Sequence, residues 1–406
     1  MLGPRAGGTG VYILGGTLFV IPLEESLGLQ RSTSALLFAM GSMMAGLSAV
    51  ASGAIMDRYG PRLVLLGSVL VSALGYFLFA AAPNTVVLFI VFVFVISPVI
   101  LNVAFNASAA YVNNWFNQYK ATAMSVLQVG AGVGALIIVP TLAFSIDTWN
   151  WRIAAVISAG FVLALGLPAA LFSRNTPEEL NMMPDGETWT VEASTITIAE
   201  PTTKQAFRTR SFWFLVASVL CFGGAQAGLQ IHFVPIMVWK GLDEVEGALI
   251  LTVMALVSTP AVLIMGPLAD RLGRLTVAGI TSLMVAAGII LLNLSDARMG
   301  IWGAALIMAP NFGMYPLIWA ALGHAFGRKA FSTIRGSVMA LQVPGTLGMP
   351  ILGGTLFDAT GSYASVLWII AGLWAAAATL LFLAPSRTHV AVSAVEASLT
   401  TSLPHA

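Results

Sequence analysis

The chain alternates between long apolar segments and short polar breaks. A helix needs about 20 apolar residues to cross a hydrocarbon core of roughly 30 Å. Turn-forming and charged residues mark the breaks, for example Pro83-Asn84 and Asp243-Glu244. The pattern predicts an all-α membrane protein with twelve transmembrane helices, at residues 3–22, 31–56, 62–82, 85–110, 121–145, 152–172, 211–236, 247–268, 275–294, 300–322, 333–357 and 362–384.

The composition supports the same class. Of the 406 residues, 58% are hydrophobic and only 9% are charged, whereas a soluble domain carries about 25% charged residues. The formal net charge of +1 gives no reason to expect a nucleic-acid partner. The single cysteine, Cys221, permits no intramolecular disulfide and no cysteine metal site, and we expect no metal and no cofactor.

The N-terminal apolar segment is not typical of a cleaved signal peptide. It lacks a basic region before its apolar core and a small-residue cleavage site after it. Residues Gly10–Leu23 lead directly into Glu24-Glu25 and are better interpreted as the first span. Because this span is short, with Pro4 near its start, we expect it to lack one or two helical turns.

The distribution of Lys and Arg predicts the orientation in the membrane. If the N-terminus is cytoplasmic, all but four of the 18 Lys and Arg lie on the cytoplasmic side, the exceptions being Arg31, Arg152, Lys240 and Arg298. We therefore predict a multi-pass protein of a plasma or inner membrane with both termini in the cytoplasm.

The polar segments predict the domain boundaries. The longest, residues 173–210, is expected to be a cytoplasmic linker between two six-helix bundles at residues 1–172 and 211–385. The polar, Ser/Thr-rich residues 386–406 are expected to form a disordered cytoplasmic tail.

The two halves share a sequence repeat. Residues 53–62 are GAIMDRYGPR and residues 266–274 are GPLADRLGR, which places Asp57 and Asp270 at the same point of each half. Similar offsets relate Pro22 to Pro235 and Gln128 to Gln342. These matches indicate a duplicated six-helix unit, which is typical of one large class of transporters.

The motif G-x-x-x-D-R-x-G-x-R at residues 53–62, with its partner at residues 266–274, resembles the loop motif of the major facilitator superfamily. Other stretches resemble its bacterial monocarboxylate and oxalate–formate branch, namely Pro22-Leu23-Glu24-Glu25, Asn114-Trp115-Phe116, the segment from Arg174 to Gly186, His232-Phe-Val-Pro235 and the segment from Phe357 to Tyr363. The resemblance implies two pseudo-symmetric six-helix bundles in a protein that functions as a monomer.

The motif residues admit two interpretations. Their glycines suit a tight turn, and their arginines lie where cytoplasmic positive charge is expected. The resemblance implies more: the aspartate contacts a neighbouring helix terminus and stabilises the outward-open state, which we favour. The candidate gating residues are Gly53, Asp57, Arg58, Gly60 and Arg62, with Gly266, Asp270, Arg271, Gly273 and Arg274 in the second half.

Polar residues inside the spans are candidates for a substrate cavity. Polar groups in hydrocarbon usually face a neighbouring helix or a water-filled cavity. Helices 1, 4, 7 and 10 line such a cavity in the family that the chain resembles. The alternative is hydrogen bonding between helices with no role in binding. The candidates are Tyr12, Asn102, Asn106, Gln128, Gln226, Gln230, His232, Asn311, Tyr315 and Gln342.

Proton coupling has three candidate residues. His232 titrates in the physiological range when unperturbed, although a hydrogen-bonded interfacial histidine explains it equally well. Glu24 and Glu25 at the outer end of the first span are rivals, with a solvated helix end as the alternative.

The basic residue that carboxylate-transporting relatives place in helix 8 is missing, since residues 247–268 carry no charge. Arg5 and Arg335 are expected only at the inner ends of their helices. A simple monocarboxylate would thus lack its counter-charge, which favours a neutral or larger organic solute, or a carboxylate held by hydrogen bonds and His232.

We therefore expect a secondary transporter that moves a small organic solute by alternating access, with protons or a counter-substrate left open. An intramembrane enzyme would need clustered catalytic groups, and neither HExxH nor Gly-x-Ser-x-Gly occurs. A receptor that binds solute without moving it, and a proton-independent uniporter, remain alternatives.

Overall fold

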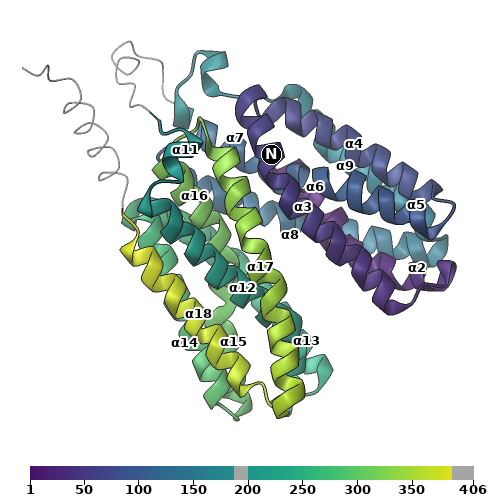
Figure 1. The fold of residues 1–406 in the computed structure, drawn as a ribbon, viewed down its shortest axis with the longest axis vertical. Coiled ribbons are helices and arrows are strands. Elements are labelled where there is room, and N and C mark those ends of the chain that lie inside the picture. Colours follow the sequence, from purple (N-terminus) through teal and green to yellow (C-terminus); the bar gives the residue numbers. More distant parts are fainter. Residues whose placement is uncertain (187–199, 386–406) are drawn as a thin grey trace, which may run out of the picture. The chain divides into compact units, whose positions relative to one another are not determined.

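A computed structural model describes residues 1–186 and 200–385 of the chain, and its regular elements are all helices (Figure 1). Labels with η denote 3₁₀ or π segments. The first half contains α1 (Leu2–Gly8), η1 (Thr9–Leu14), η2 (Gly15–Phe19), α2 (Val20–Leu27), α3 (Arg31–Tyr59), α4 (Pro61–Ala81), α5 (Thr85–Ile90), η3 (Val91–Ile96), α6 (Ser97–Leu101), η4 (Asn102–Asn106), α7 (Ala107–Trp115), α8 (Lys120–Thr148), α9 (Trp151–Phe172), η5 (Pro177–Leu180) and η6 (Pro184–Gly186).

The second half has the same character. It contains α11 (Thr203–Ala206), α12 (Arg210–Trp239), α13 (Glu244–Leu272), α14 (Arg274–Leu294), α15 (Arg298–Met308), η7 (Ala309–Gly313), α16 (Met314–Phe326), α17 (Phe331–Thr360) and α18 (Ala364–Leu383). The predicted tail at 386–406 and residues 187–199 of the predicted linker lie outside the described residues.

The predicted spans correspond to long helices. Within the described ranges, eleven helices are long and apolar enough to cross a membrane, and α17 is a further helix of 30 residues. Several extend beyond the predicted ends, as at Arg298–Phe326, where the sequence predicts 300–322. The helix continues until Gly327, whose φ of +76° ends it, whereas the apolar pattern stops earlier.

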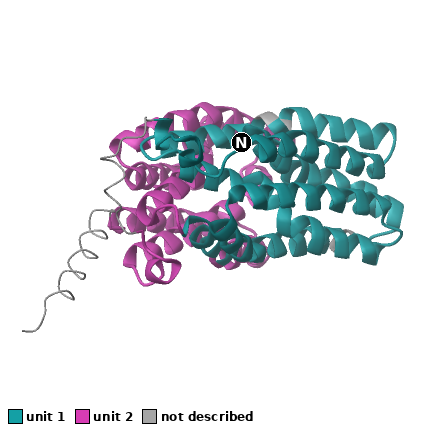
Figure 2. Ribbon diagram, turned by 90° about the horizontal axis from the view of Figure 1, so that it is seen from above, with its two compact units in different colours: residues 1–188, 330–340 teal, residues 189–329, 341–406 magenta. Residues whose placement is uncertain are grey.

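The chain forms two compact units (Figure 2). Unit 1 comprises residues 1–188 and 330–340, and unit 2 comprises residues 189–329 and 341–406. The start of α17 therefore belongs to unit 1 and the remainder of this helix to unit 2. The predicted boundaries at 172, 210 and 385 stay predictions.

Each unit packs its helices in the manner that the sequence repeat suggests. The pair α4 and α9 makes extensive contacts in unit 1, and the pair α14 and α18 does so in unit 2. These pairs are the third and sixth spans of each half. A small residue lies in both interfaces, Gly166 against Val69 and Gly279 against Phe382, because small side chains let helices approach closely in lipid.

Three spans contain irregular helical segments. The π segments η1 and η4 interrupt the first and fourth spans, and the 3₁₀ segment η7 interrupts the tenth. Glycines flank η1, and Pro310 lies in η7, where it cannot donate a backbone hydrogen bond. Such segments often occur at functional sites, and Tyr12, Asn102, Asn106 and Asn311 all lie in them.

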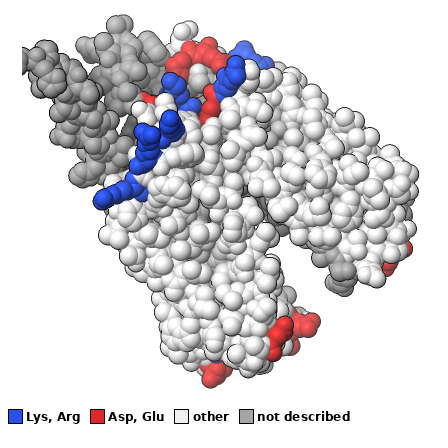
Figure 3. Space-filling view, in the orientation of Figure 1, with Lys and Arg blue, Asp and Glu red and all other residues white. Residues whose placement is uncertain are grey.

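The molecular surface suits a bilayer. Figure 3 shows a face that is largely free of charged side chains, with the visible charges gathered toward helix ends. Leu136 in α8 and Leu256 in α13 are 78% and 73% exposed. Apolar side chains so exposed along a long helix are what lipid contact predicts, so the chain is a multi-pass membrane protein.

Two glycines of α8 provide a stability test. A Cβ on Gly134 would collide with the backbone of Ala6, whereas a Cβ on Gly132 would meet nothing within 4 Å. We expect Gly134→Ala to lower the free energy of unfolding by about 1–3 kcal/mol. The control Gly132→Ala should leave it unchanged or raise it by up to about 1 kcal/mol, since alanine favours helix. Thermal unfolding of the purified protein in detergent compares the two, and equal effects would contradict the packing of α1 on α8.

Candidate functional site

The first copy of the repeated motif places its aspartate on the start of another helix. Asp57 accepts hydrogen bonds from the backbone N–H groups of Ser332 at 3.0 Å and Thr333 at 2.8 Å, in the first turn of α17. Gly53 lies one turn before Asp57, and a Cβ there would collide with the Ser332 backbone. The glycine thus allows the approach that brings the carboxylate to the positive end of the α17 dipole.

The remaining residues of this motif organise the turn between α3 and α4. Gly60 has a φ of +86°, which glycine adopts without strain. The Arg62 side chain donates to the carbonyls of Ala170 at 3.1 Å and Leu171 at 2.7 Å, at the C-terminal end of α9. Arg58 is exposed and lies over the Tyr59 ring. Arg62 therefore has a capping role that a topology signal alone does not require.

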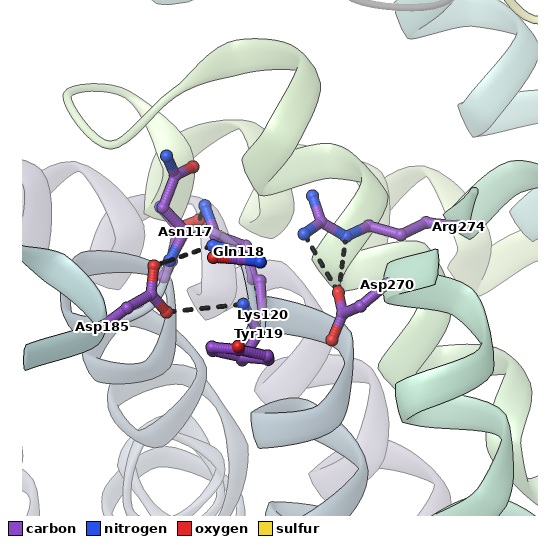
Figure 4. Close-up of polar contacts among 8 residues, drawn as sticks. Asn117, Gln118, Tyr119, Lys120, Asp185, Asp270 and Arg274 are labelled. Atoms are coloured by element: carbon purple, nitrogen blue, oxygen red, sulfur yellow. Dashed lines mark hydrogen bonds and ion pairs between the residues drawn. The ribbon is translucent and has the colours of Figure 1, made fainter. Parts of the chain in front are cut away.

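The second copy of the motif forms the same turn, but its aspartate contacts an arginine of the motif. Arg274 donates to Asp270 through Nε at 3.2 Å and Nη2 at 3.0 Å (Figure 4). Gly273 has a φ of +101°, matching Gly60. Gly266 is buried, like its counterpart Gly53. Arg271 is exposed, like its counterpart Arg58.

Two linker carboxylates bind the loops that precede α8 and α17. Asp185 accepts from the backbone N–H groups of the loop at 117–119, with the shortest bond, from Gln118, at 2.8 Å (Figure 4). Glu200 accepts from the N–H groups of Arg328 at 2.9 Å and Lys329 at 2.7 Å. The loops occupy equivalent places in the two halves. The sequence interpretation of a plain linker missed both contacts.

Three candidate cavity residues of unit 1 take part in two side-chain hydrogen bonds. Tyr12 donates to the Ser97 hydroxyl at 2.9 Å, and its ring stacks on Phe92. Asn106 Nδ2 donates to Asn102 Oδ1 at 2.9 Å, so these two side chains share a helix face, as their spacing predicts. Both asparagines are buried in η4.

Unit 2 brings together most of its own candidates. Gln226 donates to Asn311 at 3.3 Å, and the Gln342 amide donates to the Tyr315 hydroxyl. Gln342 and Gln128 are equivalent in the repeat, but Gln128 accepts from Arg5. Gln230 is exposed and is not brought into these pairs.

His232 is engaged through both ring nitrogens. Its Nε2 lies 2.9 Å from the Pro350 carbonyl of α17, and its Nδ1 lies 3.3 Å from the Tyr363 hydroxyl. A carbonyl can only accept, so Nε2 carries a proton, and in the neutral ring Nδ1 accepts from Tyr363. This arrangement fits the interfacial hydrogen-bonding alternative and leaves the coupling role a prediction.

The two glutamates after the first span differ in environment. Glu24 is half-buried, and its buried Oε1 has no hydrogen-bond partner in the part of the chain that the structure describes. Glu25 is exposed. Glu24 is therefore the more enclosed of the two coupling candidates. No group of three or more His, Cys, Asp or Glu among residues 1–186 and 200–385 is placed to hold a metal ion.

Sequence reasoning missed two buried arginines. Arg5 and Arg335 lie near the starts of α1 and α17, close to the helix ends where they were expected, but they are only 5% and 3% exposed, and both belong to unit 1. Arg5 donates to the Ala104 carbonyl at 3.1 Å and to Gln128, and Arg335 donates to Asn106. No sequence signal marks their burial, because an arginine near the end of a span also satisfies the positive-inside rule.

Comparisons with known proteins give a consistent result. The family model described as Major Facilitator Superfamily matches residues 6–343. Monocarboxylate transporter 12 of Mus musculus is 24% identical over 283 residues, covering 64% of this chain and 58% of the relative. The chain thus spans less than two thirds of that relative's length.

Two further similarities extend over more of the chain. The uncharacterized MFS-type transporter YcxA of Bacillus subtilis is 22% identical over 365 residues, covering 85% of this chain and 84% of the relative. The crystal structure of the E. coli fucose:proton symporter FucP matches with a TM-score of 0.75 at 15% identity, covering 95% of this chain and 98% of that chain. At that identity the likeness shows the fold alone.

The motif arginines predict different sensitivities to mutation. We expect Arg62→Met to reduce the free energy of unfolding by about 1–2 kcal/mol, because it removes charged hydrogen bonds to the end of α9. Arg58→Met is the matched control and should change it by less than about 0.5 kcal/mol, since Arg58 is exposed. Thermal unfolding in detergent measures both. Equal losses would mean that Arg62 contributes only its charge.

Proposed function

Because the chain belongs to the Major Facilitator Superfamily, we propose that it is a secondary transporter that moves a small organic solute across a membrane by alternating access. The observation that carries the proposal is the set of buried polar side chains on irregular segments of otherwise apolar spans. Polar side chains within membrane spans usually face a water-filled cavity or another helix, and π segments inside helices often occur at functional sites. The named relatives are transporters, in agreement with a non-enzymatic role.

The candidate cavity residues offer amide and hydroxyl groups that suit an organic solute with several hydrogen-bonding atoms. Asn102 and Tyr315 are equivalent in the repeat and lie in the fourth and tenth spans, and Gln128 and Gln342 form a second equivalent pair. Two related sets of polar groups are what a duplicated transporter would use to hold one solute. Protons or a counter-substrate would supply the driving force, with Glu24 and His232 as coupling candidates.

The proposed gate is the contact between Asp57 and α17. The first residues of α17 belong to unit 1 and the rest of the helix to unit 2. A carboxylate that holds the first turn of α17 against α3 therefore stabilises one state of the transport cycle, which we assign as the state closed on the cytoplasmic side. The proposed orientation, with both termini in the cytoplasm of a plasma or inner membrane, places the motif on that side.

Counterflow in proteoliposomes tests the transport proposal against the receptor alternative. Vesicles that contain the purified chain and an excess of unlabelled solute should accumulate labelled solute transiently, and protein-free vesicles should not. A receptor would bind the labelled solute in proportion to protein, without an accumulation that depends on the internal solute. That outcome would refute the transport function.

The gate has its own test. Asp57→Asn removes the charge from two backbone hydrogen bonds, which should cost about 1 kcal/mol and shift the ratio of the two accessible states roughly fivefold. Labelling of single cysteines on each side of the membrane measures that ratio. Asp147→Asn at the exposed end of α8 is the control and should leave the ratio unchanged. An unchanged ratio in Asp57→Asn would exclude the gating role.

A further inference from the structure

Unit 1 contains two buried arginines, Arg5 and Arg335, that are not among the candidate cavity residues. We call them, with their hydrogen-bond partners, the cationic cluster. Arg5 of α1 and Arg335 of α17 contact neighbouring residues of the π segment η4. The Arg5 guanidinium donates to the Ala104 carbonyl at 3.1 Å and lies 3.8 Å from the centre of the Phe105 ring. Arg335 donates to the Asn106 side chain, two residues along η4 from the Ala104 carbonyl that accepts from Arg5.

The glycine-rich packing of the first span explains how Arg5 reaches this position. A Cβ on Gly8 would lie 2.7 Å from the Ala104 backbone, and one on Gly134 would collide with Ala6. The missing side chains let α1 approach both η4 and α8 closely. The Arg5 side chain is thereby directed along η4, where it meets Gln128 of α8.

The charge of Arg5 is not balanced by its surroundings. All of its recorded partners are neutral, namely a carbonyl, an amide and an aromatic ring. Its Nε is buried and has no hydrogen-bond acceptor among the described residues. An arginine has five N–H donors in a planar arrangement that fits a carboxylate through two parallel hydrogen bonds.

The sequence also limits where a counter-charge can come from. The segments that carry Arg5, Arg335 and their hydrogen-bond partners lie within residues 1–23, 58–146 and 297–357, and these stretches contain no Asp or Glu. The nearby Asp57, on α3, already accepts hydrogen bonds from the backbone N–H groups of Ser332 and Thr333. A guanidinium with only neutral partners, as at Arg5, is costly to bury in an apolar unit unless an anion accompanies it. Gln128 and Phe105, which contact Arg5, are half-buried.

From these observations we infer that Arg5 and Arg335, with Gln128 and Asn106, form a binding site for the carboxylate group of an organic anion. This cluster supplies the positive charge that helix 8 lacks, so it removes the main sequence argument against a carboxylate. For its place in a transport cycle the inference rests on the proposed function, whereas binding itself is tested without transport.

The test measures binding to the full-length protein purified in detergent. The probes are acetate, lactate, oxalate and succinate, each paired with its neutral amide, and isothermal titration calorimetry gives the dissociation constants. At least one carboxylate should bind, and its amide should bind at least tenfold more weakly. Arg5→Gln and Arg335→Gln should each weaken binding of that carboxylate at least tenfold.

Two further variants keep the test specific. Arg5→Lys retains the charge but not the paired hydrogen bonds, so its loss of affinity should fall between those of wild type and Arg5→Gln. Arg152→Gln is the matched control, because Arg152 donates to the carbonyls of Ala80 and Ala82 away from the cluster, and its affinity should stay within twofold of wild type. If Arg5→Gln fails to fold, Arg5→Lys and Arg335→Gln carry the test.

The inference is overturned if no carboxylate binds the wild-type protein, if an amide binds as tightly as its acid, or if the folded cluster variants retain wild-type affinity. These results are separate from the counterflow assay. Arginine-dependent binding without counterflow would refute the transport proposal and keep the site. Counterflow of a solute by a wild-type protein that binds no carboxylate would keep transport and refute the site.

Discussion

Hydrocarbon cannot solvate a charge or an unpaired backbone amide, and the arrangement of this chain follows from that constraint. The spans are helices because a helix satisfies its backbone internally. Polar side chains within them pair with one another, as Asn106 does with Asn102 and Gln226 with Asn311. A buried charge is costly unless its partners compensate it, and Arg5 and Arg335 are buried near the starts of α1 and α17.

Carboxylates in this chain serve a different purpose from the buried arginines. Asp57, Asp185 and Glu200 each accept hydrogen bonds from backbone N–H groups at or just before the start of a long helix. Such groups have no partner within their own helix, and the helix dipole favours negative charge there. Negative charge thus stabilises the starts of α8 and α17, while positive charge is kept in the interior of unit 1.

Much of the fold could be predicted from the sequence, because its signals are local. Apolar length defined the spans, and the offset of 213 between Asp57 and Asp270 indicated the duplication. The i,i+4 spacing of Asn102 and Asn106 placed them on one face. The burial of Arg5 could not be predicted, because an arginine near a span end also satisfies the positive-inside rule. The contact of Arg335 with Asn106 joins residues 229 apart, and only tertiary structure shows it.

In the proposed site, the two buried arginines act on one ligand. A double-mutant cycle measures this directly, using the carboxylate that binds wild type best and the binding free energies of Arg5→Gln, Arg335→Gln and the double variant. If both guanidinium groups hold the same anion, the two effects should be non-additive by about 1 kcal/mol or more. Additive effects within about 0.3 kcal/mol would show that the arginines act independently and would contradict a shared carboxylate site.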